Sequence, residues 1–300
     1  MVTHHAAPEE DIMLRTLAKT VVLLAIPVLA WGSNASAAPE PTVQELLEKA
    51  KTCEDFDCPP LAALIRSGPS LWPDLEWGLA VERDELVRFW TLGVMSEVKI
   101  EAARPLLETL LSGDKLVRIR AAAAYALGNM GGAAAKGPLL AALKDKDVNV
   151  RFEAVSALGR MRVKNAGKPL RKMLRDKDAD VRAAAIDALG LLKEQASFDA
   201  VVRRLGGDPA AVVRGHAAVA LGNTSRAEAV APLIARLTAE KDADALSAAC
   251  WALGELKPKS ALTSLEALTK HRHPKVAKHA SDAIAAIKAN PDLAPKKATK

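Results

Sequence analysis

Cysteine and histidine are the residues of this 300-residue chain whose spacing could support metal or redox chemistry. Cys53 and Cys58 lie five residues apart, and His271, His273 and His279 gather near the C-terminus. A metal site needs three or four convergent ligands. No second ligand pair lies near the cysteines, and no acid or cysteine stands beside the histidines. We therefore predict no metal site and interpret the histidines as turn and surface residues.

The two cysteines are better suited to a small disulfide loop. Cys53 and Cys58 enclose the segment Glu-Asp-Phe-Asp and precede two prolines. In an oxidising compartment a closely spaced pair of this kind forms a disulfide. Half of a metal site and two unpaired thiols stay open as alternatives. We predict the disulfide.

No constellation of catalytic residues is present in the sequence. It contains no glycine-rich phosphate loop, no nucleophile elbow and no His-Glu-x-x-His zinc motif. We therefore expect that the protein is not an enzyme. We predict no catalytic residue and no cofactor.

The composition indicates which elements carry these residues. Hydrophobic side chains make up 50% of the chain and charged ones 26%, but aromatic ones only 3%. Sheets rely on aromatic and β-branched residues, so a large β-sandwich or barrel is disfavoured. The apolar content is too high for disorder of the whole chain. A chain rich in Ala and Leu favours closely packed helices, and we predict an all-α fold.

An internal repeat organises most of the chain. The tripeptide Ala-Leu-Gly recurs with its glycine at successive spacings of 31, 31, 32 and 32 residues. In four of the five units an arginine stands eight residues before the glycine, and in all five an acid stands six residues before that arginine position. In the fifth unit Glu240 is the acid and Leu246 replaces the arginine. The five glycines are Gly128, Gly159, Gly190, Gly222 and Gly254.

Polar residues that recur at fixed positions are typical of contacts between stacked units. We therefore expect the repeated acids and arginines to form a structural ladder of hydrogen bonds along the stack. The residues of this ladder are Asp114, Arg120, Asp145, Arg151, Asp176, Arg182, Asp208 and Arg214.

Each repeat predicts a pair of helices. A proline followed by leucines opens the first helix in most units, as at Pro105 and Pro138, because a proline in the first turn loses no hydrogen bond. The acid of the turn is expected to accept N–H groups at the start of the second helix. The glycine is expected to end that helix in a left-handed conformation. Cys250 replaces a small apolar residue of the other units and is predicted to be buried.

The pattern Asp-x-x-x-x-Val-Arg followed by Ala-Leu-Gly, as in residues 145–159 and 176–190, resembles the HEAT repeat, in particular the short variety first associated with phycobilisome lyases. The resemblance covers about residues 82–288. It implies a right-handed α-solenoid of stacked helix pairs, a HEAT-like superhelix whose first helices line the concave surface. Residues 38–81 depart from the repeat and are expected to form a helical cap, and residues 289–300 a disordered basic tail.

The same resemblance says little about activity, because the family includes lyases, hydroxylases and plain scaffolds. The iron-dependent hydroxylases carry His-Glu dipeptides as metal ligands. This sequence contains no such dipeptide. That activity is therefore not carried over to this chain.

The first 37 residues have the features of a secretory signal peptide. Arg15 and Lys19 supply a positive start, and residues 21–31 are apolar but too short to span a bilayer. Residues 35–37 read Ala-Ser-Ala, which suits cleavage after Ala37. We expect a periplasmic or secreted bacterial protein that does not span the membrane once it is processed. An uncleaved anchor and a buried helix stay open as alternatives.

The formal net charge of +6 conceals a division along the chain. Residues 38–113 carry 14 acids and 7 bases, whereas residues 114–300 carry 19 acids and 33 bases. Stacked helices bring equal repeat positions side by side. The bases of the first helices in the middle units are therefore expected to form a stripe on the concave wall. The residues of this basic stripe are Arg171, Lys172, Arg175, Arg203, Arg204 and Arg236.

Two interpretations of the basic stripe stay open. It is either a solvated face that keeps the protein soluble, or a docking surface for an acidic protein segment or an anionic envelope polymer. Nucleic acid suits positive charge, but the stripe lacks interleaved aromatic residues for base stacking. Export would also remove the protein from most nucleic acid, so we expect no nucleic-acid partner.

These observations favour a non-catalytic exported scaffold that binds a protein partner, with an acidic segment of that partner on the basic stripe. The alternative is a lyase-type or chaperone-like HEAT-repeat protein that acts on a pigment- or cofactor-carrying protein. The sequence leaves the oligomeric state open.

Overall fold

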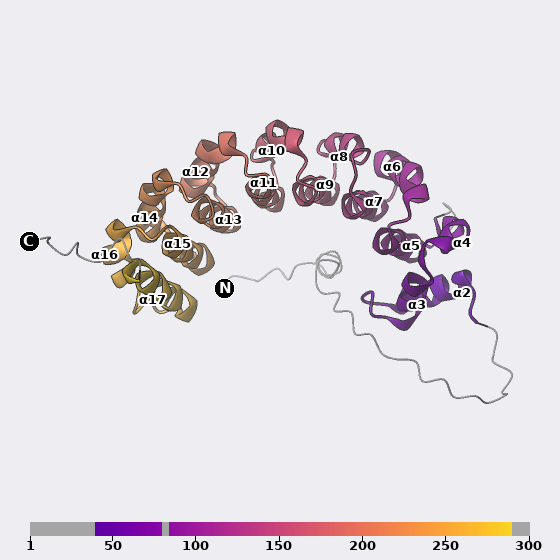
Figure 1. Ribbon diagram of the computed structural model, residues 1–300, viewed down its shortest axis with the longest axis horizontal. Helices are drawn as coiled ribbons and strands as arrows, with labels where there is room; N and C mark the ends of the chain where they lie inside the picture. The colour runs from indigo at the N-terminus through magenta and orange to yellow at the C-terminus, as the bar shows by residue number, and fades with distance from the viewer. Residues whose placement is uncertain (1–39, 80–83, 290–300) are drawn as a thin grey trace, which may run out of the picture. The chain divides into compact units, whose positions relative to one another are not determined.

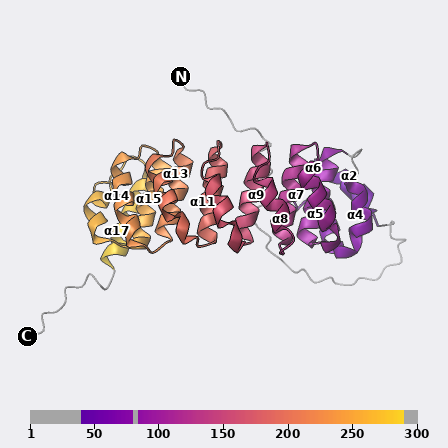
Figure 2. The same ribbon diagram turned by 90° about the horizontal axis from the view of Figure 1, so that it is seen from above.

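The computed structural model describes residues 40–79 and 84–289 (Figures 1 and 2). These residues form α-helices joined by short 3₁₀ turns and loops, and none of them lies in a β-strand. The predicted all-α fold is confirmed. The predicted signal peptide, the predicted boundary between residues 81 and 82, and residues 290–300 of the predicted tail lie outside the described residues. No helix within the described ranges is long and apolar enough to cross a membrane.

The helices divide into two compact units, residues 40–110 and residues 111–289. We refer to them as the N-terminal unit and the C-terminal unit. The helices of the N-terminal unit are α2 (Val43–Lys49), α3 (Pro59–Ser67), α4 (Trp72–Gly78), α5 (Glu85–Val98) and most of α6 (Arg104–Gly113).

The N-terminal unit has a capped first helix and its own hydrophobic core. At α2 the hydroxyl of Thr42 accepts the backbone N–H of Glu45 at 3.2 Å, and the Glu45 carboxylate accepts the N–H of Thr42 at 3.0 Å. This reciprocal capping box satisfies two N–H groups at the helix start. Helices α2, α3 and α4 each contact α5, their leucines are among the buried residues, and Trp90 of α5 is only 2% exposed.

The C-terminal unit begins with one helix and continues with five helix pairs among its described residues. In each pair a short first helix is followed by a longer second helix. The helices are α7 (Val117–Met130), α8 (Lys136–Ala142), α9 (Val148–Arg160), α10 (Gly167–Met173), α11 (Ala179–Leu191), α12 (Phe198–Gly207), α13 (Ala211–Gly222), α14 (Val230–Ala239), α15 (Ala243–Leu256), α16 (Leu262–Glu266) and α17 (Pro274–Lys288).

Within the C-terminal unit the helices form two parallel rows that curve. Helices α7, α9, α11, α13, α15 and α17 make up the inner row, and each contacts the next (Figure 1). Helices α8, α10, α12, α14 and α16 make up the outer row. Figure 2 shows the inner helices side by side along the unit. The unit is an α-solenoid of stacked helix pairs, as predicted.

The inner row is close-packed because glycine and alanine meet between its helices. A Cβ atom on Gly159 would lie 2.7 Å from the Ala188 Cβ, and one on Gly222 would lie 2.8 Å from the Ala252 Cβ. Real Cβ atoms do not approach so closely, so these positions need glycine. Gly128 abuts an alanine of the next inner helix in the same way.

This packing corrects the prediction that the repeat glycine ends its helix in a left-handed conformation. Gly159 lies within α9, and the left-handed residue follows three positions later, at Arg162 with φ 48°. The same offset of three residues recurs in the other repeats. The left-handed residues at this offset are Lys99, Gly131, Arg162, Lys193, Ser225 and Lys257.

The prediction that the first helices line the concave surface is wrong for the C-terminal unit. They form the outer row of the curve, and the alanine-rich second helices form the inner row (Figure 1). The physical reason is spacing. Small residues let the second helices approach closely, whereas the first helices carry Leu, Lys and Arg and stand farther apart. A stack with one close row and one wide row curves toward the close row.

Candidate functional site

The predicted ladder residues form bidentate ion pairs between successive repeats. Arg151 donates from Nε and Nη2 to the two carboxylate oxygens of Asp176 at 2.8 and 2.9 Å. Arg120 reaches Asp145 in the same way, at 2.9 and 3.1 Å. The equivalent partner of Arg214 is Glu240, at 2.7 and 2.6 Å. Two parallel hydrogen bonds fix both distance and orientation.

Each ladder arginine also donates hydrogen bonds to backbone carbonyls of the turn before its own helix. The Nη1 of Arg151 donates to the backbone carbonyls of Asp145 and Lys146 at 3.0 and 3.1 Å. At the start of the ladder the carbonyl of Asp114 accepts from Arg120 at 2.9 Å, and the Asp114 carboxylate accepts the N–H of Leu116. One arginine therefore ties two carbonyls of its own turn to the acid of the next unit. These contacts engage Nε, Nη1 and Nη2 of Arg151 in packing between repeats.

Burial and hydrogen bonding act in opposite directions on the ladder acids. Burial by itself would raise the pKa of Glu240, but hydrogen bonds from Arg214 and from the N–H of Asp242 lower that pKa to about 2. The pKa values of Asp145, Asp176 and Asp208 are lowered for the same reasons, against the effect of burial. The ladder is therefore charged at neutral pH.

A second acid, missed in the sequence, caps three of the inner helices, α9, α11 and α15. Asp178 is the N-cap of α11 and accepts the N–H groups of Asp180 and Val181 at 2.9 and 3.3 Å. The ladder acid Asp176 accepts the N–H of Asp178 two residues on. Asp147 and Asp242 cap their helices likewise. The signal was present as acid-Lys-Asp, in which the second acid is the cap.

A basic cleft lies between the outer helices α10 and α12. Its volume is about 760 Å³. Six of its ten lining residues are cationic and none is acidic. The cations that line this cleft are Lys168, Arg171, Lys172, Arg175, Arg203 and Arg204. A smaller hollow beside α8 and α10, of about 460 Å³, has only two lysines.

The structure brings five residues of the predicted basic stripe together in this cleft and separates the sixth. Arg236 lies on α14, where it pairs with Glu240 at 3.0 Å and donates to the carbonyl of Gly206. Its side chain is 13% exposed, so Arg236 is a packing residue. The spacing of four between Arg236 and Glu240 already indicated this pairing. Lys168, which the sequence reasoning missed, stands one residue before the proline of α10 and joins the cleft.

The cations of the cleft differ in how they are engaged. Arg171 pairs with Glu194, and Arg204 pairs with Asp208 at 3.2 Å. Lys168, Lys172, Arg175 and Arg203 are exposed, and none of these four forms an ion pair or a side-chain hydrogen bond with another described residue. Together they form an exposed cluster of four positive charges over one hollow. We call these four residues the open cations.

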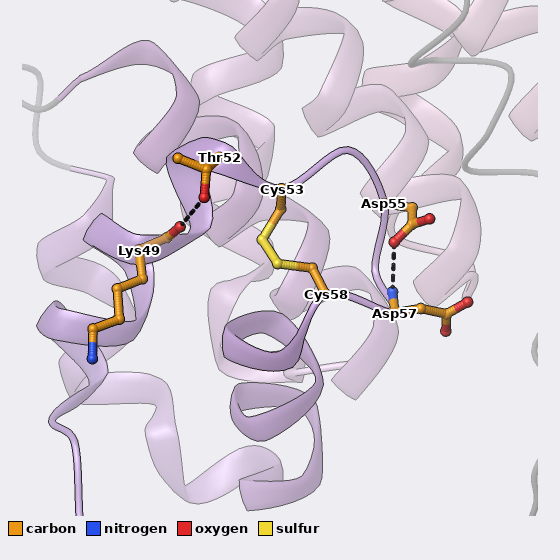
Figure 3. Close-up of a disulfide and its surroundings, with 6 residues drawn as sticks. All are labelled: Lys49, Thr52, Cys53, Asp55, Asp57 and Cys58. Carbon is orange, nitrogen blue, oxygen red and sulfur yellow. Dashed lines mark hydrogen bonds between the residues drawn. A yellow bond between two sulfur atoms is a disulfide. The ribbon is translucent and has the colours of Figure 1, made fainter.

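The cysteines and histidines lie apart from this cleft. Cys53 and Cys58 are joined by a disulfide in the N-terminal unit (Figure 3). Cys250 is fully buried in α15, and burial raises the pKa of its thiol to about 12. His279 Nδ1 lies 2.6 Å from the Ser247 hydroxyl. Among the described residues, no three His, Cys, Asp or Glu side chains are grouped as metal ligands would be.

Comparison with known proteins agrees with this architecture. The family model for HEAT repeats matches residues 73–147, 137–222 and 230–296. No curated protein shows significant sequence similarity to the chain. The X-ray structure of YibA from Escherichia coli is similar in fold, with 17% identity, a TM-score of 0.62, and coverage of 97% of this chain and 100% of that one.

Two further solved structures also match the chain. A Kap121p mutant has 17% identity and a TM-score of 0.56, and the match covers 82% of this chain but only 32% of that one. The complex of CpcE and CpcF of phycocyanin lyase from Nostoc has 18% identity and a TM-score of 0.47, and covers 87% of this chain and 100% of the matched chain. The repeat geometry and the family match together identify the chain as a member of the HEAT-repeat family.

Proposed function

We propose that this protein is a non-catalytic exported scaffold that binds an acidic segment of a protein partner in the basic cleft between α10 and α12. The observation that carries the proposal is the set of open cations, Lys168, Lys172, Arg175 and Arg203, over a hollow with no acidic lining residue. HEAT repeats expose long surfaces suited to protein interaction, because each unit contacts only its neighbours.

The chemistry of the cleft favours carboxylates on a polypeptide. Arginine binds a carboxylate through two parallel hydrogen bonds, and lysine adds a point charge of the same sign. The lining also offers apolar surface from Ala196 and Ala200, against which the backbone of a bound segment would pack. No aromatic residue lines the cleft, so the stacking platforms that hold single-stranded nucleic acid are missing from it.

Two features support export. Residues 1–37 have the composition of a signal peptide, and the N-terminal unit contains a disulfide, which persists in oxidising compartments. The proposed site of action is the bacterial periplasm or the cell exterior.

A binding experiment with labelled peptides tests the cleft. The probes are a peptide rich in Glu and Asp and a peptide of the same length with Gln and Asn in their place. We expect only the acidic peptide to bind, with an affinity that falls as salt rises. Reversal of three open cations, in K172E/R175E/R203E, is expected to weaken binding at least about tenfold.

The matched control is K144E/K259E/K270E, which makes the same charge change at exposed lysines outside the cleft. If both triple variants lose affinity equally, only net charge matters and the cleft is not the site. If neither loses affinity, the acidic peptide binds elsewhere. Either result contradicts the proposal.

A further inference from the structure

The disulfide of the N-terminal unit holds an acidic loop, residues 53–58. Glu54, Asp55 and Asp57 are all exposed, and none of them forms an ion pair with another described residue. Figure 3 shows Asp55 and Asp57 on the loop beside the disulfide, where the Asp57 N–H donates to the Asp55 carboxylate at 3.0 Å. Three open negative charges therefore stand within four residues.

Phe56 anchors this acidic loop to its unit. Its ring meets Trp90 edge to face, with 5.3 Å between the ring centroids. Gly93 of α5 leaves the space for the ring, since a Cβ atom there would overlap Phe56. The disulfide fixes the two ends of the loop and Phe56 fixes its middle. A segment held in this way loses little conformational entropy when it binds.

The acidic loop and the basic cleft are complementary in charge. The loop presents three carboxylates without ion pairs and the cleft presents the four open cations. The same opposition holds for the chain as a whole, since residues 38–113 have 14 acids and 7 bases and residues 114–300 have 19 acids and 33 bases. Oppositely charged surfaces on one polypeptide attract between copies at low ionic strength.

We propose that the acidic loop of one copy docks in the basic cleft of a second copy, so that the chain assembles head to tail. The inference rests on the proposed function, because it names the acidic segment that the cleft takes. The contact is heterologous, with different surfaces on the two copies. Each addition leaves one free cleft and one free acidic loop, so the assembly grows into open chains unless its geometry closes a ring.

The test is a mixing experiment with two variants. One has a reversed acidic loop, E54K/D55K/D57K, and an intact cleft. The other has a reversed cleft, K172E/R175E/R203E, and an intact acidic loop. Sedimentation velocity at low salt, about 0.02 M, measures the species of each protein alone and of an equimolar mixture.

Head-to-tail docking predicts a specific pattern. The wild-type chain forms dimers and larger species as its concentration rises, and about 0.5 M salt reverses this. Each variant alone is a monomer. The mixture forms a one-to-one complex that does not grow, because only one intact acidic loop and one intact cleft remain. Formation of that complex also shows that both variants are folded.

Three results would overturn the inference. The first is a wild-type chain that stays monomeric at every concentration. The second is a reversed acidic loop that leaves self-association unchanged. The third is a monomer in which the reversed acidic loop raises the affinity for the acidic peptide, because then the loop occupies the cleft of its own chain. Each result leaves the proposed function standing wherever the acidic peptide still binds the cleft. If the wild-type chain does not bind the acidic peptide, both the proposed function and the head-to-tail assembly are contradicted.

Discussion

Arg182 holds the carboxylate of Asp208 with two parallel hydrogen bonds, from Nε at 2.9 Å and from Nη2 at 2.8 Å, and the Asp208 side chain is fully shielded from solvent. Arg182 lies in α11, and Asp208 follows α12. The pair therefore links one unit of the stack to the next. Arg204 adds a third hydrogen bond to the same carboxylate.

The burial of this pair predicts how it responds to mutation. Removal of Arg182 leaves the shielded Asp208 carboxylate with Arg204 as its remaining cationic partner, and loss of one partner of a buried ion pair costs about 3–5 kcal/mol. We expect Arg182→Met to destabilise the C-terminal unit by an amount in that range. Denaturant unfolding followed by circular dichroism measures the difference.

The controls separate pairing from packing. The double variant R182M/D208L replaces both charges with apolar side chains and is expected to recover much of the loss. Lys275→Ala removes an exposed pair with Asp244 and is expected to cost no more than about 1 kcal/mol. An Arg182→Met variant as stable as Lys275→Ala would show that the ladder contributes nothing.

Glu240 predicts the pH dependence of the ladder. Its pKa in the folded protein is about 2, below its ordinary value of 4.5. A depressed pKa means that the folded state favours the ionised form. The resulting stability is present above about pH 4.5 and is lost as the pH falls through about 2. Acid titration of the unfolding free energy should therefore show a loss over this window.

Glu240→Gln isolates that contribution. The amide keeps the shape but cannot carry the charge that Arg214 and Arg236 face. We expect the variant to be about 2–3 kcal/mol less stable at pH 7 and to differ little from the wild type near pH 2. A difference between the two proteins that stays constant from pH 7 to pH 2 would contradict the assignment.

The repeat glycines predict opposite effects of the same substitution at two positions. In Gly159→Ala the new Cβ would lie 2.7 Å from the Ala188 Cβ, so the inner row must spread, and we expect a loss of about 1–3 kcal/mol. At Gly190 nothing lies within 4 Å of the added atom. Gly190→Ala should therefore stabilise the helix by about 0.5–1 kcal/mol. Thermal unfolding of the two variants decides, and equal shifts would exclude the close-packing explanation.

The repeat pattern predicted the ladder because every part of it is local or repeats at one offset. An arginine such as Arg151, at the same position of each unit, has one acid within reach in the next unit. The direction of curvature could not be predicted in this way. It depends on whether the first or the second helices approach more closely, which contacts such as that of Gly159 with Ala188 decide between helices of different units.

The candidate site was predicted in part for the same reason. Equal positions on α10 and α12 placed Lys172 and Arg203 over one cleft. Arg236 was misassigned because its guanidinium lies against the end of α12, where it donates to the carbonyl of Gly206, a contact with another helix that helix spacing alone does not predict. The cleft itself arises from the wide spacing of the outer row, and that spacing has no signature in a single repeat.

The disulfide is expected to stabilise the N-terminal unit. The loop closed by the disulfide between residues 53 and 58 is short. Removal of the disulfide is therefore expected to lower the unfolding free energy by only about 2 kcal/mol. We expect Cys53→Ser with Cys58→Ser to lower the unfolding free energy of the N-terminal unit by this amount. Limited proteolysis within residues 40–110 measures it against the unchanged C-terminal unit.

The oxidation state of Cys53 and Cys58 also shows whether the protein has been exported to an oxidising compartment. Protein expressed in bacteria with residues 1–37 is expected to lose them, begin at Ala38 and resist thiol alkylation at Cys53 and Cys58 until it is reduced. Protein expressed without those residues stays in the reducing cytosol, where both thiols are expected to react at once. Cys250 is buried and serves as an internal control that reacts only after unfolding. Intact-mass spectrometry reads both changes, and a chain that keeps its first 37 residues and free thiols would rule out processing and export.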